Sequence, residues 1–225
     1  MPNALKKKMP PPKPSAKAGQ TIWRRRMLYH ERRARKDGYK NIAGIDEAGR
    51  GPLAGPVVAC ALSLKRTRFN CRVDDSKKLT PRMRLIAYDE ILEKALFGIG
   101  IINEKIIDRI NIYNATKRAM RRALESLSVK PDLVLVDGNI ALIAPGDKKY
   151  ITGGDSKSLS IACASIIAKV TRDRIMLKYH EKYPRYGFSR HKGYGTKEHM
   201  RLLLKHGPSP IHRRSFNPVK QMVAR

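Results

Sequence analysis

The chain has 225 residues, 41% of them hydrophobic, which is enough for one domain with a tail or for two small domains. No apolar run approaches the roughly 20 residues that span a membrane, and the charged, proline-rich N-terminus lacks the apolar segment of a secretory signal. The formal net charge of +29 indicates a polyanionic partner, with nucleic acid favoured over a membrane surface.

Residues 1–38 differ from the rest of the chain and are predicted to be a basic, disordered N-terminal extension. Residues 6–14 read KKKMPPPKP, and proline at this density is incompatible with the interior of a helix or strand. Residues 24–36 favour a basic helix. Its few apolar side chains are Trp23, Met27, Leu28 and Tyr29. Two roles stay open for the extension: an arm that grips a phosphate backbone, or a tail that keeps the chain in solution.

The ordered part is expected to open with a β-hairpin. Residues 42–45 are apolar and predict a short strand that ends at the acidic pair Asp46 and Glu47. A loop rich in glycine and proline follows over residues 49–56. Residues 57–64 are again apolar and predict a second strand, paired with the first.

Helices and strands alternate in the remainder of the chain. Thr80 and Pro81 are typical of an N-cap and of a first helical residue. The apolar run over 133–136 is typical of a central parallel strand. In chain order the predicted elements are a helix over 81–95, a strand over 97–102, a helix over 106–127, strands over 133–136 and 150–152, a helix over 160–181, a loop over 185–195, a helix over 196–206 and an irregular tail. This order predicts an α/β fold, a mixed central β-sheet flanked by helices, in one domain over residues 39–225.

Acidic residues are scarce, with 19 Asp and Glu against 48 Lys and Arg, yet four of them lie at the ends of predicted strands. These are Asp46, Glu47, Asp137 and Asp155. Clustered carboxylates are ligands that Mg²⁺ and Mn²⁺ prefer. Two such ions about 4 Å apart can clamp the attacking and leaving oxygens of a phosphodiester. The four residues therefore predict a metal-dependent phosphodiesterase. Taken singly, Asp137 and Asp155 are equally compatible with turn formers, and Asp155 with a helix cap.

Other residues carry weaker signals. Gly49, Arg50 and Gly51 form a loop that can approach a ligand closely and grip a phosphate, although such a triplet is also common in solvated turns. Tyr194 lies among basic residues and favours stacking on a base or sugar, with a core tyrosine as the alternative. The six histidines lack metal-binding spacing and stay unassigned. The three cysteines form no CxxC pair, which predicts reduced thiols in a cytoplasmic protein and no zinc site.

Several blocks of sequence resemble the type 2 ribonuclease H family, ribonuclease HII. The first is DEAGRGPLAGPVVA over residues 46–59. The later blocks are DSKKL over 75–79, VDGN over 136–139, GD at 154–155, SIACASIIAKVTRD over 160–173 and GYGT over 193–196. They occur in the family's order and cover roughly residues 42–217. Cys163 stands where the family usually has alanine, and the basic extension is not part of the family core.

The resemblance implies a ribonuclease H-like fold with a helical C-terminal portion, in a monomer that acts on RNA–DNA hybrids and on ribonucleotide-containing duplex DNA. It implies hydrolysis of the RNA strand and incision 5′ of single embedded ribonucleotides, giving 3′-hydroxyl and 5′-phosphate ends, with Mn²⁺ or Mg²⁺ as cofactor. The four carboxylates named above would hold the metals. Gly49, Arg50 and Gly51 would sense the ribose 2′-hydroxyl, Tyr194 would stack on the adjoining deoxyribose, and Lys77 would contact a phosphate.

Two alternatives to this activity remain at the level of the sequence. A basic nucleic-acid-binding protein without catalysis explains the charge, but not the carboxylates at strand ends. Another nuclease of the same fold, such as a junction resolvase, explains both features.

Overall fold

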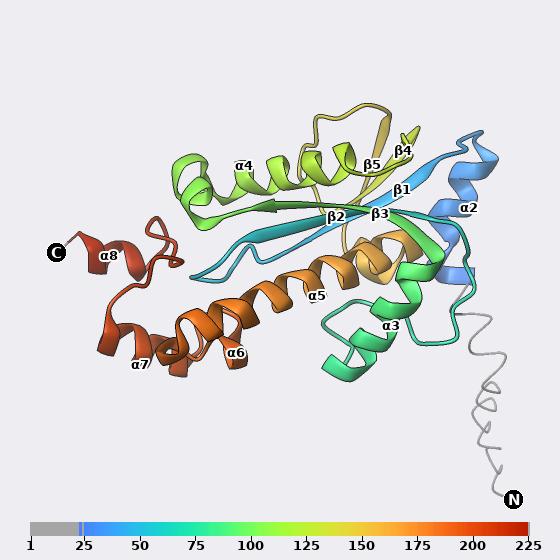
Figure 1. The fold of residues 1–225 in the computed structure, drawn as a ribbon. Coiled ribbons are helices and arrows are strands. Elements are labelled where there is room, and N and C mark those ends of the chain that lie inside the picture. Colours follow the sequence, from blue (N-terminus) through green and yellow to red (C-terminus); the bar gives the residue numbers. More distant parts are fainter. Residues whose placement is uncertain (1–22, 24, 225) are drawn as a thin grey trace, which may run out of the picture.

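The computed structural model describes residue 23 and residues 25–224, and its centre is a five-stranded mixed sheet (Figure 1). The strand order is β3-β2-β1-β4-β5. An antiparallel meander is formed by β1 (Ile42–Ala48), β2 (Val57–Leu64) and β3 (Ala95–Ile102), while β4 (Leu133–Asp137) and β5 (Asp147–Ile151) run parallel to β1. The predicted hairpin and the predicted central parallel strand are both confirmed.

Helices cover both faces of the sheet (Figure 1). On one face α4 (Glu104–Glu125) packs against β2 and β3, and on the other α5 (Leu159–Lys182) packs against β1 and β2, beside α3 (Pro81–Lys94). The shorter elements are α2 (Tyr29–Lys36), η1 (Gly154–Ser156), η2 (Pro184–Tyr186), α6 (Phe188–His191), α7 (Lys197–His206) and α8 (Val219–Val223). The predicted α/β class with a mixed sheet is therefore confirmed. In the described part of the chain, no helix is long and apolar enough to cross a membrane.

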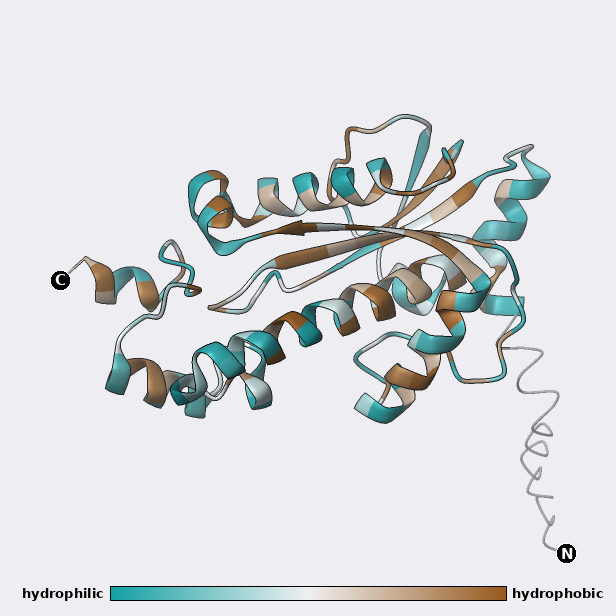
Figure 2. Ribbon diagram, in the orientation of Figure 1, coloured by the Kyte–Doolittle hydropathy of each residue, from teal (hydrophilic) through white to brown (hydrophobic). Residues whose placement is uncertain are grey.

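The alternation of side chains along the strands divides the core into two layers. Val58, Cys60 and Leu62 of β2 pack with α3 and α5, whereas Val57 and Ala59 pack with α4. The strands and the adjoining turns of α5 accordingly hold long hydrophobic stretches in Figure 2. Successive side chains along a strand therefore point alternately to the α4 face and to the α5 face of the sheet.

Gly44 allows α5 to approach β1 closely. A Cβ atom at this position would lie 2.4 Å from the backbone nitrogen of Ile161 and 2.6 Å from the Oγ of Ser160, both at the start of α5. Backbone atoms cannot yield to such a contact, so any larger residue here would push the helix away. The close approach brings η1, which precedes α5, to the edge of β1 where Asp46 lies.

Most predicted boundaries hold within two residues, and the helix caps explain why. The side chain of Thr80 accepts a hydrogen bond from the nitrogen of Met83, as expected for an N-cap. The main differences lie in the strands and the tail: β1 continues through the acidic pair because both residues pair with β2, β5 begins at Asp147, and the tail contains α8.

The expectation of a disordered extension up to residue 38 is not met by residues 27–38. Met27 and Leu28 are buried in the core layer beneath the sheet, and α2 follows them. The Glu31 carboxylate of α2 is buried and accepts hydrogen bonds from the Oγ of Ser158 and from the nitrogen and Oγ of Ser160. Buried apolar side chains and the buried Glu31 carboxylate together hold this segment in place. The helix favoured over residues 24–36 is present as α2, but its burial could not be foreseen from a basic composition. The predictions for residues 1–22 lie outside the described residues.

Candidate active site

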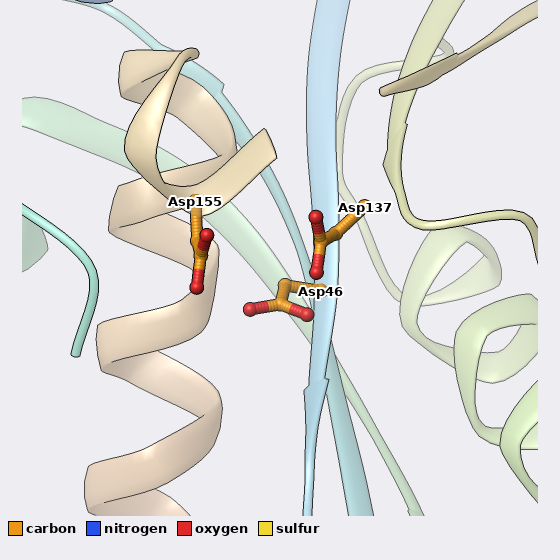
Figure 3. Close-up of side chains that lie close together, drawn as sticks. All are labelled: Asp46, Asp137 and Asp155. Carbon is orange, nitrogen blue, oxygen red and sulfur yellow. The ribbon is translucent and has the colours of Figure 1, made fainter. Parts of the chain in front are cut away.

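Three carboxylates converge at the carboxyl end of the two central parallel strands. Asp46 lies in β1, Asp137 ends β4, and Asp155 lies in η1, and one carboxylate oxygen of each lies within 4.8 Å of the others (Figure 3). Ile45 is paired in register with Val136, so the following aspartates occupy neighbouring positions on the same face of the sheet. Three of the four predicted carboxylates are therefore brought together.

Hydrogen bonds hold the cluster in place. The Oδ1 of Asp137 accepts a hydrogen bond of 2.6 Å from the backbone nitrogen of Gly154, which ties η1 to the end of β4. The Oδ1 of Asp46 accepts one of 2.7 Å from the nitrogen of Glu47. Asp46 and Asp155 are only 5% and 6% exposed, so the carboxylates are shielded from water on most sides.

This crowding of acids in a buried place raises their affinity for protons. Burial raises the pKa of Asp46 well above its usual value, and the charges of Glu47 and Asp137 raise it further. Burial and the Asp137 charge raise the pKa of Asp155 to about 6, against the opposing effect of Lys77. A bound cation would relieve the same repulsion, and the all-oxygen donor set fits a hard divalent ion.

Glu47 stands apart from the three clustered aspartates. It follows Asp46 along the strand, so its side chain leaves the opposite face of the sheet. Its Oε1 lies 3.4 Å from the Nη1 of Arg50, and its side chain is 12% exposed. Burial raises the pKa of Glu47, and the charge of Asp137 raises it further, whereas the charge of Arg50 lowers it. Glu47 is therefore coupled electrostatically to the cluster without belonging to it.

The Gly49–Arg50–Gly51 loop is held from behind by a buried arginine. Gly49 has a φ of +96°, a left-handed conformation that favours glycine. Arg213, fully buried, donates hydrogen bonds to the carbonyl oxygens of Gly49 (2.6 Å), Arg50 (2.8 Å) and Gly55 (2.9 Å). Burial and the nearby charge of Arg172 lower the pKa of Arg213 to about 9.

A second buried arginine supports the same loop. Arg172 donates to the carbonyl oxygens of Pro56 (3.0 Å) and Ala54 (3.1 Å). Within the described residues, no carboxylate lies within 4.0 Å of Arg172 or Arg213. Sequence reasoning missed the role of both residues: Arg172 lies in the block over 160–173 but was assigned no function, and nothing in the sequence distinguishes Arg213 from the other arginines of a strongly basic chain.

The remaining predicted site residues lie around this loop and the cluster. The Nζ of Lys77 is 3.8 Å from the Oδ2 of Asp155, and its side chain is 83% exposed. Tyr194 is 41% exposed, so it is not the core tyrosine of the alternative interpretation. The Cζ of Arg172 and the Nζ of Lys169 each lie 5.6 Å from the centre of its ring, which places Tyr194 beside the arginine that supports the glycine loop.

Comparison with known proteins relates this arrangement to one family. The profile of the family described as "Ribonuclease HII" matches residues 43–219. The ribonuclease HII of Bacillus licheniformis is 54% identical over 195 residues, covering 86% of this chain and 76% of the relative. That of Chlamydia pneumoniae is 50% identical over 202 residues, covering 88% of this chain and 93% of the relative.

Solved structures agree with the sequence comparison. Ribonuclease H2 from Pyrococcus horikoshii superposes with a TM-score of 0.69 at 27% identity, covering 81% of this chain and 97% of that one. The ribonuclease HII in the PCNA:RNase HII complex from Archaeoglobus fulgidus gives a TM-score of 0.60 at 26% identity, covering 74% and 87%. Bst-RNase HIII in complex with Mn²⁺ gives 0.60 at 18% identity, covering 85% and 71%, a likeness of fold alone.

Proposed function

Because the chain belongs to the ribonuclease HII family, a family of metal-dependent endonucleases with ribonuclease H activity, we propose that it cuts RNA–DNA hybrids and ribonucleotide-containing duplex DNA. In hybrids it hydrolyses the RNA strand. In duplex DNA it incises on the 5′ side of a single embedded ribonucleotide, leaving 3′-hydroxyl and 5′-phosphate ends. We further propose that it acts as a monomer in the cytoplasm and that its catalytic unit begins near Met27, where burial begins, instead of at residue 39.

The convergence of Asp46, Asp137 and Asp155 within 4.8 Å is the observation that carries this proposal. The three aspartates would hold divalent cations, Mn²⁺ or Mg²⁺, and Glu47, which follows Asp46 at the end of β1, would act as the fourth ligand. Two such ions supply a water of lowered pKa and stabilise a leaving 3′-oxygen. The carboxylates would position the ions, so no side chain would have to act as a nucleophile.

We assign substrate selection to the residues that lie beside the aspartate cluster. Gly49, Arg50 and Gly51 would read the ribose 2′-hydroxyl, the group that distinguishes RNA from DNA. A Cβ at Gly51 would meet no atom within 4 Å, so a substrate has room to approach the loop there. The exposed ring of Tyr194 would stack on the adjoining deoxyribose, and the exposed ammonium of Lys77 would contact a phosphate.

The two alternatives gain no support from the described residues. A binder without catalysis has no use for three buried carboxylates whose charges repel nucleic acid. A junction resolvase is not favoured, because the family profile and the relatives at 50–54% identity are those of ribonuclease HII.

The test is incision of a labelled DNA duplex that carries one ribonucleotide, with Mg²⁺, Mn²⁺ or excess EDTA. We expect a single cut 5′ of the ribonucleotide in either metal and none in EDTA. Asp46→Asn should remove turnover while duplex binding persists, whereas the exposed Asp89→Asn should cut at the normal rate. Cleavage in EDTA would contradict the metal mechanism, and a fully active Asp46→Asn variant would contradict the site. Preferential cutting of an all-DNA four-way junction would favour the resolvase.

A further inference from the structure

Three of the histidines that the sequence left unassigned form a buried cluster beneath Tyr194. His191, His199 and His212 are each 7% exposed or less and pack around Phe188. The rings of His191 and His199 are stacked with their centres 4.2 Å apart. The Nε2 atoms of His199 and His212 lie 3.0 Å apart, which is a hydrogen-bond distance.

The backbone partners of these rings indicate on which nitrogen each hydrogen lies. The backbone nitrogen of Ser209 donates to the Nδ1 of His212 at 2.9 Å, so a neutral His212 carries its hydrogen on Nε2. That hydrogen is donated to the Nε2 of His199, which leaves the Nδ1–H of His199 to donate to the carbonyl oxygen of Tyr194 at 2.9 Å. A one-directional chain of hydrogen bonds thus runs from Ser209 to the backbone of Tyr194.

His191 holds the other side of the same loop. The backbone nitrogen of Gly193 donates to its Nδ1 at 3.2 Å, and its Nε2 then donates to the carbonyl oxygen of Tyr186 at 2.8 Å. The carbonyl oxygen of Tyr194 and the nitrogen of the preceding residue, Gly193, are therefore both bonded to buried imidazoles. The backbone that carries the exposed tyrosine ring is therefore fixed by hydrogen bonds to buried histidines.

Arg213, the residue next to His212, holds the glycine loop. Its guanidinium bonds to the carbonyl oxygens of Gly49, Arg50 and Gly55, while His212 bonds toward Tyr194. The backbone between them is paired as well. Residues 211–213 bond to residues 53–55 through an isolated bridge and two flanking hydrogen bonds, and the nitrogen of Leu53 donates to the carbonyl of Gly193 at 2.8 Å.

We propose that residues 211–213, the connecting segment, set the spacing between the glycine loop and Tyr194, with His212 and Arg213 as positioning residues for recognition of a ribonucleotide junction. The proposal rests on the proposed function, because it assumes that both loops read the junction. Neither side chain touches the substrate. Each holds one of the two reading surfaces through the backbone, so their loss should affect the choice of substrate more than the chemistry.

The test compares kcat/KM on a single-ribonucleotide duplex with kcat/KM on a continuous RNA–DNA hybrid. His212→Phe keeps a ring of similar size and removes both the donor to His199 and the acceptor for Ser209. We expect it to lower this ratio about tenfold, the effect of losing roughly one hydrogen bond. The loss should fall mainly on KM for the junction duplex. His212→Gln, which retains a donor at the Nε2 position, should restore most of the ratio. His206→Phe is the matched control, because it lies outside the hydrogen-bonded chain and should leave the ratio unchanged.

Tyr194→Ala separates failure of this inference from failure of the proposed function. If Tyr194→Ala leaves the ratio unchanged, the proposed reading of the junction is wrong. If Tyr194→Ala lowers the ratio and a folded His212→Phe variant does not, the connecting segment has no positioning role. The double variant should lose no more than Tyr194→Ala alone, and additive losses would overturn the proposal.

A measurement on the wild-type chain avoids any dependence on folding of the variants. Two-dimensional ¹H–¹⁵N spectra that connect the ring nitrogens with the carbon-bound ring hydrogens report the tautomer of each histidine. We expect hydrogen on Nε2 of His212 and on Nδ1 of His199. The opposite tautomer at either residue would break the chain of hydrogen bonds and refute the proposal.

Discussion

Replacing Gly49 by alanine should destabilise the fold severely, because the new methyl group collides with a buried arginine. The Cβ would lie 2.1 Å from the Nε of Arg172, 2.4 Å from its Cδ and 2.7 Å from the carbonyl oxygen of Pro56. Arg172 is fully buried and cannot swing into solvent. The backbone cannot relax easily either, because the φ of +96° is one that alanine rarely adopts.

Two contributions set the magnitude of the effect. An alanine held in a left-handed conformation costs about 1–3 kcal/mol. Displacement of Arg172 breaks its hydrogen bonds to Pro56 and Ala54, and bonds from a charged donor contribute about 1.5–3 kcal/mol each to stability. We therefore expect a loss of about 4–9 kcal/mol, a large share of the total for a single domain.

Urea unfolding at 25 °C, followed by circular dichroism, measures this loss. The midpoint of Gly49→Ala should fall sharply with little change in the dependence on denaturant. Gly51→Ala is the matched control in the same loop, because its Cβ meets no atom within 4 Å and its φ lies outside the left-handed region. The control should lie within about 0.5 kcal/mol of the wild type. Equal stability of the two variants would refute the reasoning about Arg172.

Metal binding should weaken as the pH falls through about 6, because Asp155 must lose its proton to act as a ligand. Calorimetric titration with Mn²⁺ at about pH 5 and about pH 7.5 measures this, and equal affinities at the two pH values would contradict it. The same raised pKa means that metal-free protein binds more protons when folded than when unfolded, so the contribution of Asp155 to stability should improve from pH 7 toward pH 4 in thermal scans without metal. Glu31→Ala should lower the free energy of unfolding by about 2–4 kcal/mol, since it leaves buried donors of Ser160 unpaired. The control Glu93→Ala removes an exposed side chain and should change it little. Similar unfolding midpoints for the two variants would show that Glu31 does not anchor α2. Deleting residues 1–22, which contain five lysines, should weaken duplex binding and flatten its dependence on salt without moving the cut; an unchanged slope would exclude phosphate contacts by this segment.

Local patterns in the sequence were sufficient for the elements and for most of the site. Apolar periodicity and caps such as Thr80 predicted the principal helices, and apolar runs predicted the strands to within a few residues. The position of Asp46 and Asp137 at the ends of neighbouring strands was also predictable. Carboxyl ends of parallel strands meet at one edge of a sheet, so these acids were expected to converge provided that their two strands are neighbours.

The N-terminal segment shows where composition misleads. Composition predicted a disordered extension up to residue 38, although residues 24–36 favoured a basic helix. That helix is present as α2, with Met27 and Leu28 buried before it and Glu31 bonded to the start of α5. Two apolar side chains and one carboxylate are enough to hold a short basic helix, provided that a matching surface exists. That surface is formed by residues more than a hundred positions away, which no local pattern can reveal.

By itself the sequence determined the fold class and the family, and its four candidate carboxylates include the three that converge. Only the tertiary structure decided that Asp46 and Glu47 point to opposite faces of the sheet, because pairing with β2 extends β1 through both residues and successive side chains of a strand alternate. It also decided the roles of Arg213 and His212. Their side chains act on peptide groups distant in sequence, through hydrogen bonds that exist only once the chain has brought those segments together.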